Sequence, residues 1–113
     1  MQESVRAGKT VDTEMHESIA EGLHAGVEKS SITLGMIRRY ADDIFLVKEE
    51  TIRKAIYLLW KQEKQVAEGS GAVAVALLLE KSSMFVGQTV AAVVTGANIG
   101  ESLFREILSA EGN

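Results

Sequence analysis

The chain has 113 residues, of which 46% are hydrophobic and 25% charged; it has no cysteine and a formal net charge of −4. This composition predicts one small soluble domain, residues 1–113, and excludes disulfides and thiolate metal sites. The acidic balance disfavours nucleic-acid binding. The longest apolar run, Ala72 to Leu79, is far shorter than the roughly 20 residues that span a bilayer, and the N-terminus lacks an apolar signal-peptide core. We therefore expect a cytoplasmic protein.

The first third of the chain gives weak structural signals. Residues 1–13 are polar and aperiodic, so we predict an N-terminal arm. Mixed three- and four-residue spacing of apolar residues indicates a short helix from Thr13 to Ala25, and a second is indicated from Leu34 to Tyr40. The run Ile44 to Val47 has four consecutive apolar residues with β-branched and aromatic content, which predicts a buried strand.

The clearest element follows at residues 49–64. Glu49 and Glu50 suit the first turn of a helix, and Lys61 and Lys64 suit the last, because each complements the helix dipole there. The apolar residues between them recur at helical spacing and predict one buried stripe. These residues are Ile52, Ala55, Ile56, Leu59 and Trp60.

The last third alternates between glycine-containing turns and apolar runs. Residues 68–71 predict a turn with Ser70 as a helix N-cap, and residues 72–79 fit a buried helix better than a strand, although the Ala/Val alternation leaves both open. Thr89 to Val94 predicts a second buried strand, residues 95–100 a loop, and residues 103–108 an amphipathic helix. This order predicts an α/β fold with helices packed on a small parallel or mixed sheet.

Two polar residues are candidates for a site. Thr95 follows a predicted strand and precedes a helix, where α/β proteins bind ligands, but a plain strand-to-helix connection capped by Asn98 fits the spacing as well. Glu68 adjoins a flexible turn between two apolar helices; it is either a functional carboxylate or a solvated helix end. His16 and His24 lack the ligand spacing of a metal site, so none is expected.

Several segments together resemble the C-terminal portion of the threonine/serine dehydratase family, which includes serine racemases. The resemblance covers roughly residues 4–108 with the spacing kept. The segments that carry it are Ser-Ile-Ala-Glu-Gly-Leu at 18–23, Gly-Val-Glu at 26–28 with Tyr-Ala-Asp-Asp-Ile-Phe-Leu-Val at 40–47, Glu-Glu-Thr-Ile-Arg-Lys-Ala-Ile at 49–56, Val-Ala-Glu-Gly-Ser-Gly-Ala at 66–72, and Val-Val-Thr-Gly-Ala-Asn-Ile at 93–99.

The resemblance implies a partial large domain of the fold type II pyridoxal-phosphate enzymes. It implies that Thr95 hydrogen-bonds the pyridine nitrogen of pyridoxal phosphate, that Glu68 and Gly22 lie beside the cofactor, and that Gly96 and Asn98 belong to the loop that presents Thr95. The chemistry implied is that of a lyase, removing water and ammonia from threonine or serine to give a 2-oxo acid.

The departures from the family bear on activity. The Ser-Phe-Lys-x-Arg-Gly motif, whose lysine anchors the cofactor, and the glycine-rich phosphate loop have no counterpart here, so we expect no catalytic residue, no bound cofactor and no activity in this chain alone. A partner chain with the N-terminal half would supply both. Unpaired strand edges favour a homo-oligomer, with exchanged elements as one form. The alternative is a free-standing, non-catalytic module that binds a small ligand or a protein.

Overall fold

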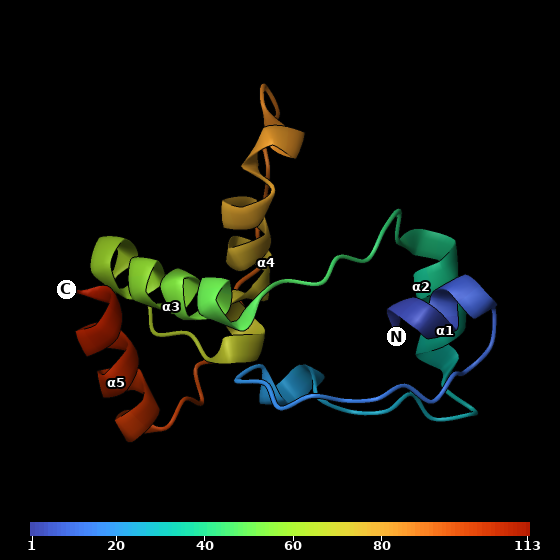
Figure 1. The fold of residues 1–113 in the computed structure, drawn as a ribbon. Helices are drawn as coiled ribbons and strands as arrows, with labels where there is room; N and C mark the ends of the chain where they lie inside the picture. Colours follow the sequence, from blue (N-terminus) through green and yellow to red (C-terminus); the bar gives the residue numbers. More distant parts are fainter. The chain divides into compact units, whose positions relative to one another are not determined.

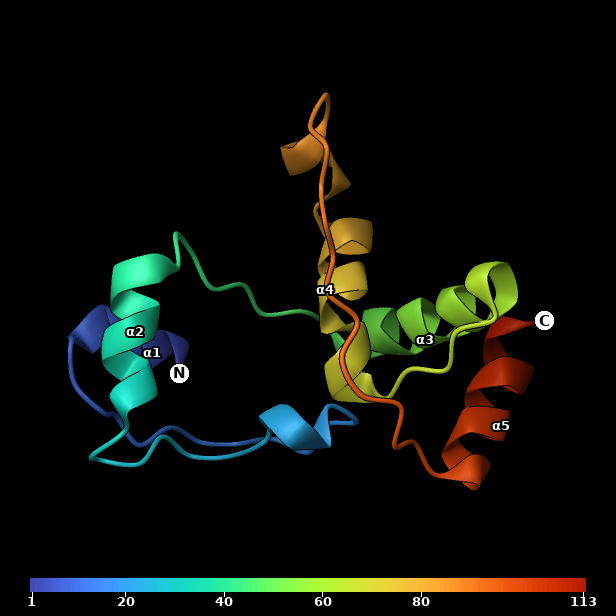
Figure 2. The ribbon, with the colours of Figure 1, turned by 180° about the vertical axis from the view of Figure 1, so that it is seen from behind.

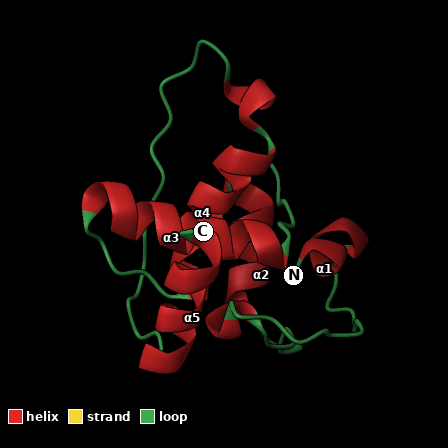
Figure 3. Ribbon diagram, turned by 60° about the vertical axis from the view of Figure 1, so that its left-hand side comes forward, coloured by secondary structure: helices red, strands yellow, loops and turns green.

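The computed structural model describes all 113 residues and contains helices only (Figures 1 and 3). Close contacts divide the chain into two compact units: residues 1–17 with 24–46, and residues 18–23 with 47–113. None of the helices combines the length and apolarity needed to cross a bilayer. The helical elements are α1 (Gln2–Ala7), the 3-10 turn η1 (Glu21–Leu23), α2 (Ile32–Tyr40), α3 (Glu49–Glu63), α4 (Gly69–Glu80), the 3-10 turn η2 (Ser82–Phe85) and α5 (Glu101–Glu111).

The first unit is a pair of short helices, α1 and α2. The Ser4 hydroxyl is buried and accepts the backbone N–H of Val11 at 3.0 Å, and the Gln2 amide donates to the carbonyl of Ile44 at 2.6 Å. These bonds use side chains in the stretch predicted to be an irregular arm, so residues 1–13 include a helix that the sequence pattern did not indicate. The second helix was predicted at 34–40 and is present as α2.

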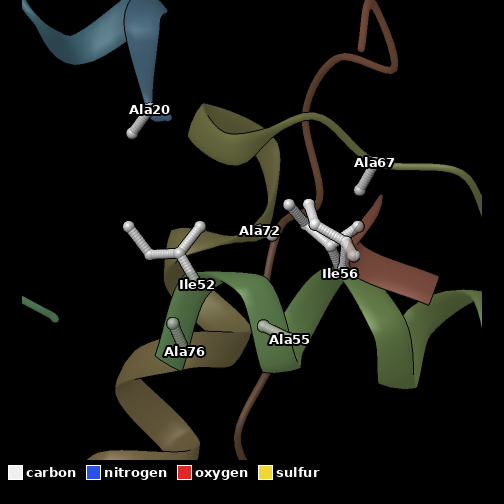
Figure 4. Close-up of a cluster of buried hydrophobic side chains, with 8 residues drawn as sticks. Ala20, Ile52, Ala55, Ile56, Ala67, Ala72 and Ala76 are labelled. Atoms are coloured by element: carbon white, nitrogen blue, oxygen red, sulfur yellow. The ribbon is translucent and has the colours of Figure 1, made fainter. Parts of the chain in front are cut away.

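The second unit is built from α3, α4 and α5 around a small apolar core (Figure 4). Five of its eight buried apolar residues are alanines, and small side chains allow the backbones of α3 and α4 to lie close together. Trp60 of α3 packs edge-on against Phe104 of α5, with ring centroids 5.7 Å apart. The core residues are Ala20, Ile52, Ala55, Ile56, Ala67, Ala72, Ala76 and Ile107.

The helix predicted at 49–64 is confirmed as α3, but its N-terminus is held by a residue far away in the sequence. Lys48 is the N-cap and its side chain makes no capping bond. The Glu80 carboxylate, at the end of α4, accepts the Lys48 N–H at 2.6 Å. This bond, a second one from the Thr51 hydroxyl and the charges of Lys48 and Lys81 hold the pKa of the Glu80 carboxyl below its ordinary value. The apolar run 72–79 is helical, as part of α4.

The predicted sheet is absent from this structure, because residues 44–47 and 89–94 form no strand. A strand exists through hydrogen bonds to a neighbouring strand, and residues 89–94 make no backbone hydrogen bond within the chain. Leu46 and Val93, which were expected to be buried, are 74% and 72% exposed. The small residues of α4 therefore pack against α3 instead of against a sheet.

Candidate functional site at the start of α4

The first turn of α4 is the point where two distant segments of the second unit meet. Gly69 lies against the backbone carbonyl of Ile19, and Gly71 lies against the backbone carbonyl of Thr95. A Cβ atom on either glycine would overlap these backbone atoms, which cannot rotate away as a flexible side chain could. Glycine is therefore required here for close approach, and it brings residues 18–23 and 95–100 to the same end of α4.

The segment 18–23 is tied to this end by two side chains. The Gly22 N–H donates to the Ser70 hydroxyl at 2.8 Å, and the Ile19 N–H donates to a Glu49 carboxylate oxygen at 3.0 Å. Ala20, between them, is buried in the core. Backbone N–H groups that are bound to side chains cannot form helical bonds to preceding carbonyls, so the helix predicted from Thr13 to Ala25 is wrong and only the turn η1 is helical.

The loop 95–100 is held by contacts with Glu68. Gly96 has φ +66°, a left-handed conformation that favours glycine, and its carbonyl accepts the Glu68 N–H at 3.2 Å. A Cβ atom at Gly96 would meet the Glu68 carboxylate, so a side chain there would have to displace that carboxylate. Glu68 occupies the N-cap position of α4; Ser70, predicted to be the N-cap, binds Gly22 instead.

These contacts enclose a pocket of about 60 Å³. Three of the five predicted site residues line it: Gly22, Glu68 and Asn98. The other two do not line the pocket. Gly96 contacts the Glu68 carboxylate, and Thr95 is exposed, with its backbone carbonyl against Gly71. The remaining lining residues are Ile19, Glu21, Gly69, Ser70, Ile99, Gly100 and Leu103.

The pocket is polar and its polar groups have opposite electrostatic character. Glu21 and Glu68 contribute carboxylates, whereas the first turns of α4 and α5, at Gly69 and Glu101, contribute the positive ends of helix dipoles. Such a pocket can bind a small polar group that both donates and accepts hydrogen bonds. No lysine lines it, so the pocket residues offer no amine for a covalent bond to a carbonyl ligand.

Sequence reasoning missed the tethers Ser70 and Glu49. The only signal for Ser70 was its place between two glycines, which is also typical of an ordinary turn, and Glu49 was explained by the helix dipole alone. Both side chains act on the backbone of residues 19–22, about 30 to 50 positions away in the sequence. A hydrogen-bond partner so far away in the sequence leaves no pattern among neighbouring residues from which it could be predicted. His16 and His24 are exposed.

Residues 1–96 match a family model described as pyridoxal-phosphate dependent enzyme. A putative threonine dehydratase of Sinorhizobium fredii is 34% identical over 96% of this chain and 33% of its own length, and an L-threonine ammonia-lyase of Thermotoga maritima is 36% identical over 94% of this chain and 26% of its own. These matches confirm the resemblance drawn from the motifs.

Solved structures agree with the sequence matches. The T.th. threonine deaminase superimposes with a TM-score of 0.79 at 30% identity, and the serine racemase of Dictyostelium discoideum with a TM-score of 0.73 at 29% identity. Each superposition covers 88% of this chain, but only 35% and 31% of the solved chains. The chain therefore spans about a third of the length of the relatives that it matches.

Proposed function

Because this chain belongs to the family of pyridoxal-phosphate dependent enzymes, we propose that it forms one wall of the cofactor site of a dehydratase, the wall that faces the cofactor ring. The reaction is the removal of water and ammonia from threonine or serine, which leaves a 2-oxo acid. The observation that carries the proposal is the pocket at the start of α4, which brings together Gly22, Glu68 and Asn98 from three separate family motifs.

The residues of the pocket fit the ring of pyridoxal phosphate. Gly69 and Gly71 pack against the backbone of Ile19 and Thr95, which holds residues 18–23 and 95–100 beside Glu68. The short polar groups that line the resulting pocket support this role. In this role the Thr95 hydroxyl hydrogen-bonds the pyridine nitrogen, Glu68 and Gly22 border the ring, and Asn98 with Gly96 holds the loop that presents Thr95. When bound, the cofactor supplies the electron sink for the amino acid, and the protein supplies its orientation.

The other walls of the site come from elsewhere. An amine to anchor the cofactor and a glycine-rich loop to hold its phosphate lie outside the pocket residues. We propose that the N-terminal half of the family's architecture supplies both, as a partner chain would. On assembly, residues 44–47 and 89–94 become strands of a parallel or mixed sheet. The assembled enzyme contains more than one copy of this chain and lies in the cytoplasm. The chain without its partner does not turn over substrate.

A chimera tests the proposal. Residues of this chain replace the matching segment of the Thermotoga maritima L-threonine ammonia-lyase, and 2-oxobutanoate formation from threonine is measured with saturating pyridoxal phosphate. We expect activity in the chimera and a fall of about tenfold in Thr95→Val, the effect of losing one hydrogen bond of about 1.4 kcal/mol. Thr89→Val is the matched control, because it makes the same change at an exposed threonine outside the pocket.

Two results would contradict the proposal. One is a chimera that folds and binds the cofactor but forms no 2-oxobutanoate, which would mean that this chain does not provide a working wall. The other is an equal effect of Thr95→Val and Thr89→Val, which would remove Thr95 from the site.

A further inference from the structure

The segment 18–23 contributes three residues to the pocket at the start of α4, yet it has little regular structure of its own. These residues are Ile19, Glu21 and Gly22, and only the three-residue turn η1 is helical. The turn lies beside the first turn of α4 in both views of the ribbon (Figures 1 and 2). Because the segment lacks the hydrogen-bond ladder of a helix or sheet, its backbone is held by bonds to neighbouring side chains, and those side chains fix where Glu21 and Gly22 lie.

Glu49 supplies the bond at the beginning of this segment. Its carboxylate, in the first turn of α3, accepts the Ile19 N–H at 3.0 Å. An ionised acceptor binds an N–H more strongly than a neutral one does. Glu49 is not among the residues that line the pocket, so its influence on a ligand there passes through the backbone of residues 19–22.

The far end of the segment is held as well. The Ser70 hydroxyl accepts the Gly22 N–H at 2.8 Å, and Ala20, between the two bonds, is buried in the core. Gly69 lies against the Ile19 carbonyl, which leaves no space for this part of the backbone to shift toward α4. The segment is short, bonded at both ends and packed in its middle, so loss of the bond at Ile19 loosens the residues up to Gly22.

We propose that Glu49 is a positioning residue for the cofactor site, and that its bond to Ile19 keeps residues 21–22 in the place that a bound pyridoxal phosphate requires. The inference rests on the proposed function and adds a residue of α3 to it. Glu50 provides a contrast within the same turn. It has the same charge and meets the same helix dipole, but its ion pair is with Lys48, at 3.8 Å on the surface. The bond to the Ile19 N–H therefore distinguishes the two glutamates.

Hydrogen exchange of the whole chain tests whether the bond at Ile19 holds the pocket residues. Glu49→Ala should speed exchange of the Ile19 amide, which loses its acceptor, and of the Gly22 amide at the other end of the segment, each by about fivefold or more. Glu49→Gln should restore the parent rates, because a side-chain amide oxygen still accepts the N–H. Glu50→Ala is the matched control and should leave both amides unchanged. An effect on Ile19 alone, or an equal effect of Glu50→Ala, would overturn the inference.

Cofactor binding by the chimera tests the consequence for the site. The dissociation constant of pyridoxal phosphate should be about fivefold higher in Glu49→Ala than in the parent chimera, the effect of losing one hydrogen bond. Glu49→Gln and Glu50→Ala should stay within about twofold of the parent. A lower urea midpoint of unfolding with an unchanged dissociation constant would give Glu49 a purely structural role and refute its role in positioning. A parent chimera that binds the cofactor but forms no 2-oxobutanoate contradicts the proposed function instead, so the two can fail separately.

Discussion

Gly71→Ala is the substitution whose sign depends most directly on the geometry of the site. Gly71 lies in the first turns of α4 and is buried, and the nearest atoms to a Cβ built there are backbone atoms of Thr95 and Gly96. Helix propensity alone predicts that alanine stabilises α4 by about 1 kcal/mol. Contact with the loop predicts the opposite.

The magnitude follows from which neighbour must move. Overpacking of a tight site typically costs about 1–3 kcal/mol. Here the cost falls at the upper end of this range, because the Thr95 carbonyl belongs to the backbone and the adjoining Gly96 is held by its bond to the Glu68 N–H at 3.2 Å. After the propensity gain is subtracted, we expect Gly71→Ala to lower the free energy of unfolding of the second unit by about 1–2 kcal/mol.

The assay is urea unfolding followed by the fluorescence of Trp60, the only tryptophan, which packs on Phe104 within the second unit. Gly35→Ala is the control: Gly35 is also helical, in α2, but a Cβ there meets nothing within 4 Å. It should increase the helical signal and leave the Trp60 transition in place. If Gly71→Ala is as stable as the parent or more stable, the loop does not press on α4 and the reasoning fails.

Three further predictions concern the tethers, acid and activity. Ser70→Ala should remove the acceptor of the Gly22 N–H, lower stability by about 0.5–1.5 kcal/mol and speed exchange of the Gly22 amide in NMR. The pKa of Glu80 is lowered on folding, so its carboxylate contributes to stability above the ordinary pKa of 4.5, and this contribution is lost as the pH falls through the lower pKa of the folded state. The stability of Glu80→Gln, measured by urea unfolding, should therefore differ from that of the parent above pH 4.5 and converge with it in acid. The chain alone should form no 2-oxobutanoate from threonine above a pyridoxal-phosphate blank, and measurable formation by the pure chain would contradict the missing-anchor argument.

Helices with a local signal could be predicted from the sequence. The stripe of α3, with Ile52, Ala55 and Ile56 at helical spacing, is buried as expected, because an amphipathic helix carries its own hydrogen bonds and needs only a surface to cover. The same reasoning applies to α5, where Ile107 is buried. The helix α1 within residues 1–13 could not be predicted, because it is only six residues long and its buried residue is a serine, so no apolar period exists to detect.

The strand predictions were not confirmed although the local signal was present. The composition of residues 44–47 and 89–94 is that of buried strands, but a strand is completed by hydrogen bonds to a neighbour that the sequence of the segment does not specify. Gly22, Glu68 and Asn98, expected beside the cofactor, line one pocket, and their role there stays a prediction. Ser70 was given the wrong role because it accepts a hydrogen bond from Gly22, 48 residues away.

The family motifs of the second unit coincide with its packing contacts, and this overlap decides how the site must be tested. Residues 18–23, Glu49, the Glu68–Gly71 turn and the Thr95–Asn98 loop all meet around the first turn of α4. A substitution at a glycine there lowers stability whether or not the glycine takes part in binding, so loss of activity alone would not identify a binding residue. Thr95 is different, because its side chain lies on the surface. Thr95→Val should therefore leave the Trp60 unfolding transition unchanged and still weaken the dehydratase reaction of the chimera, and an effect on both would assign Thr95 to the fold rather than to the cofactor.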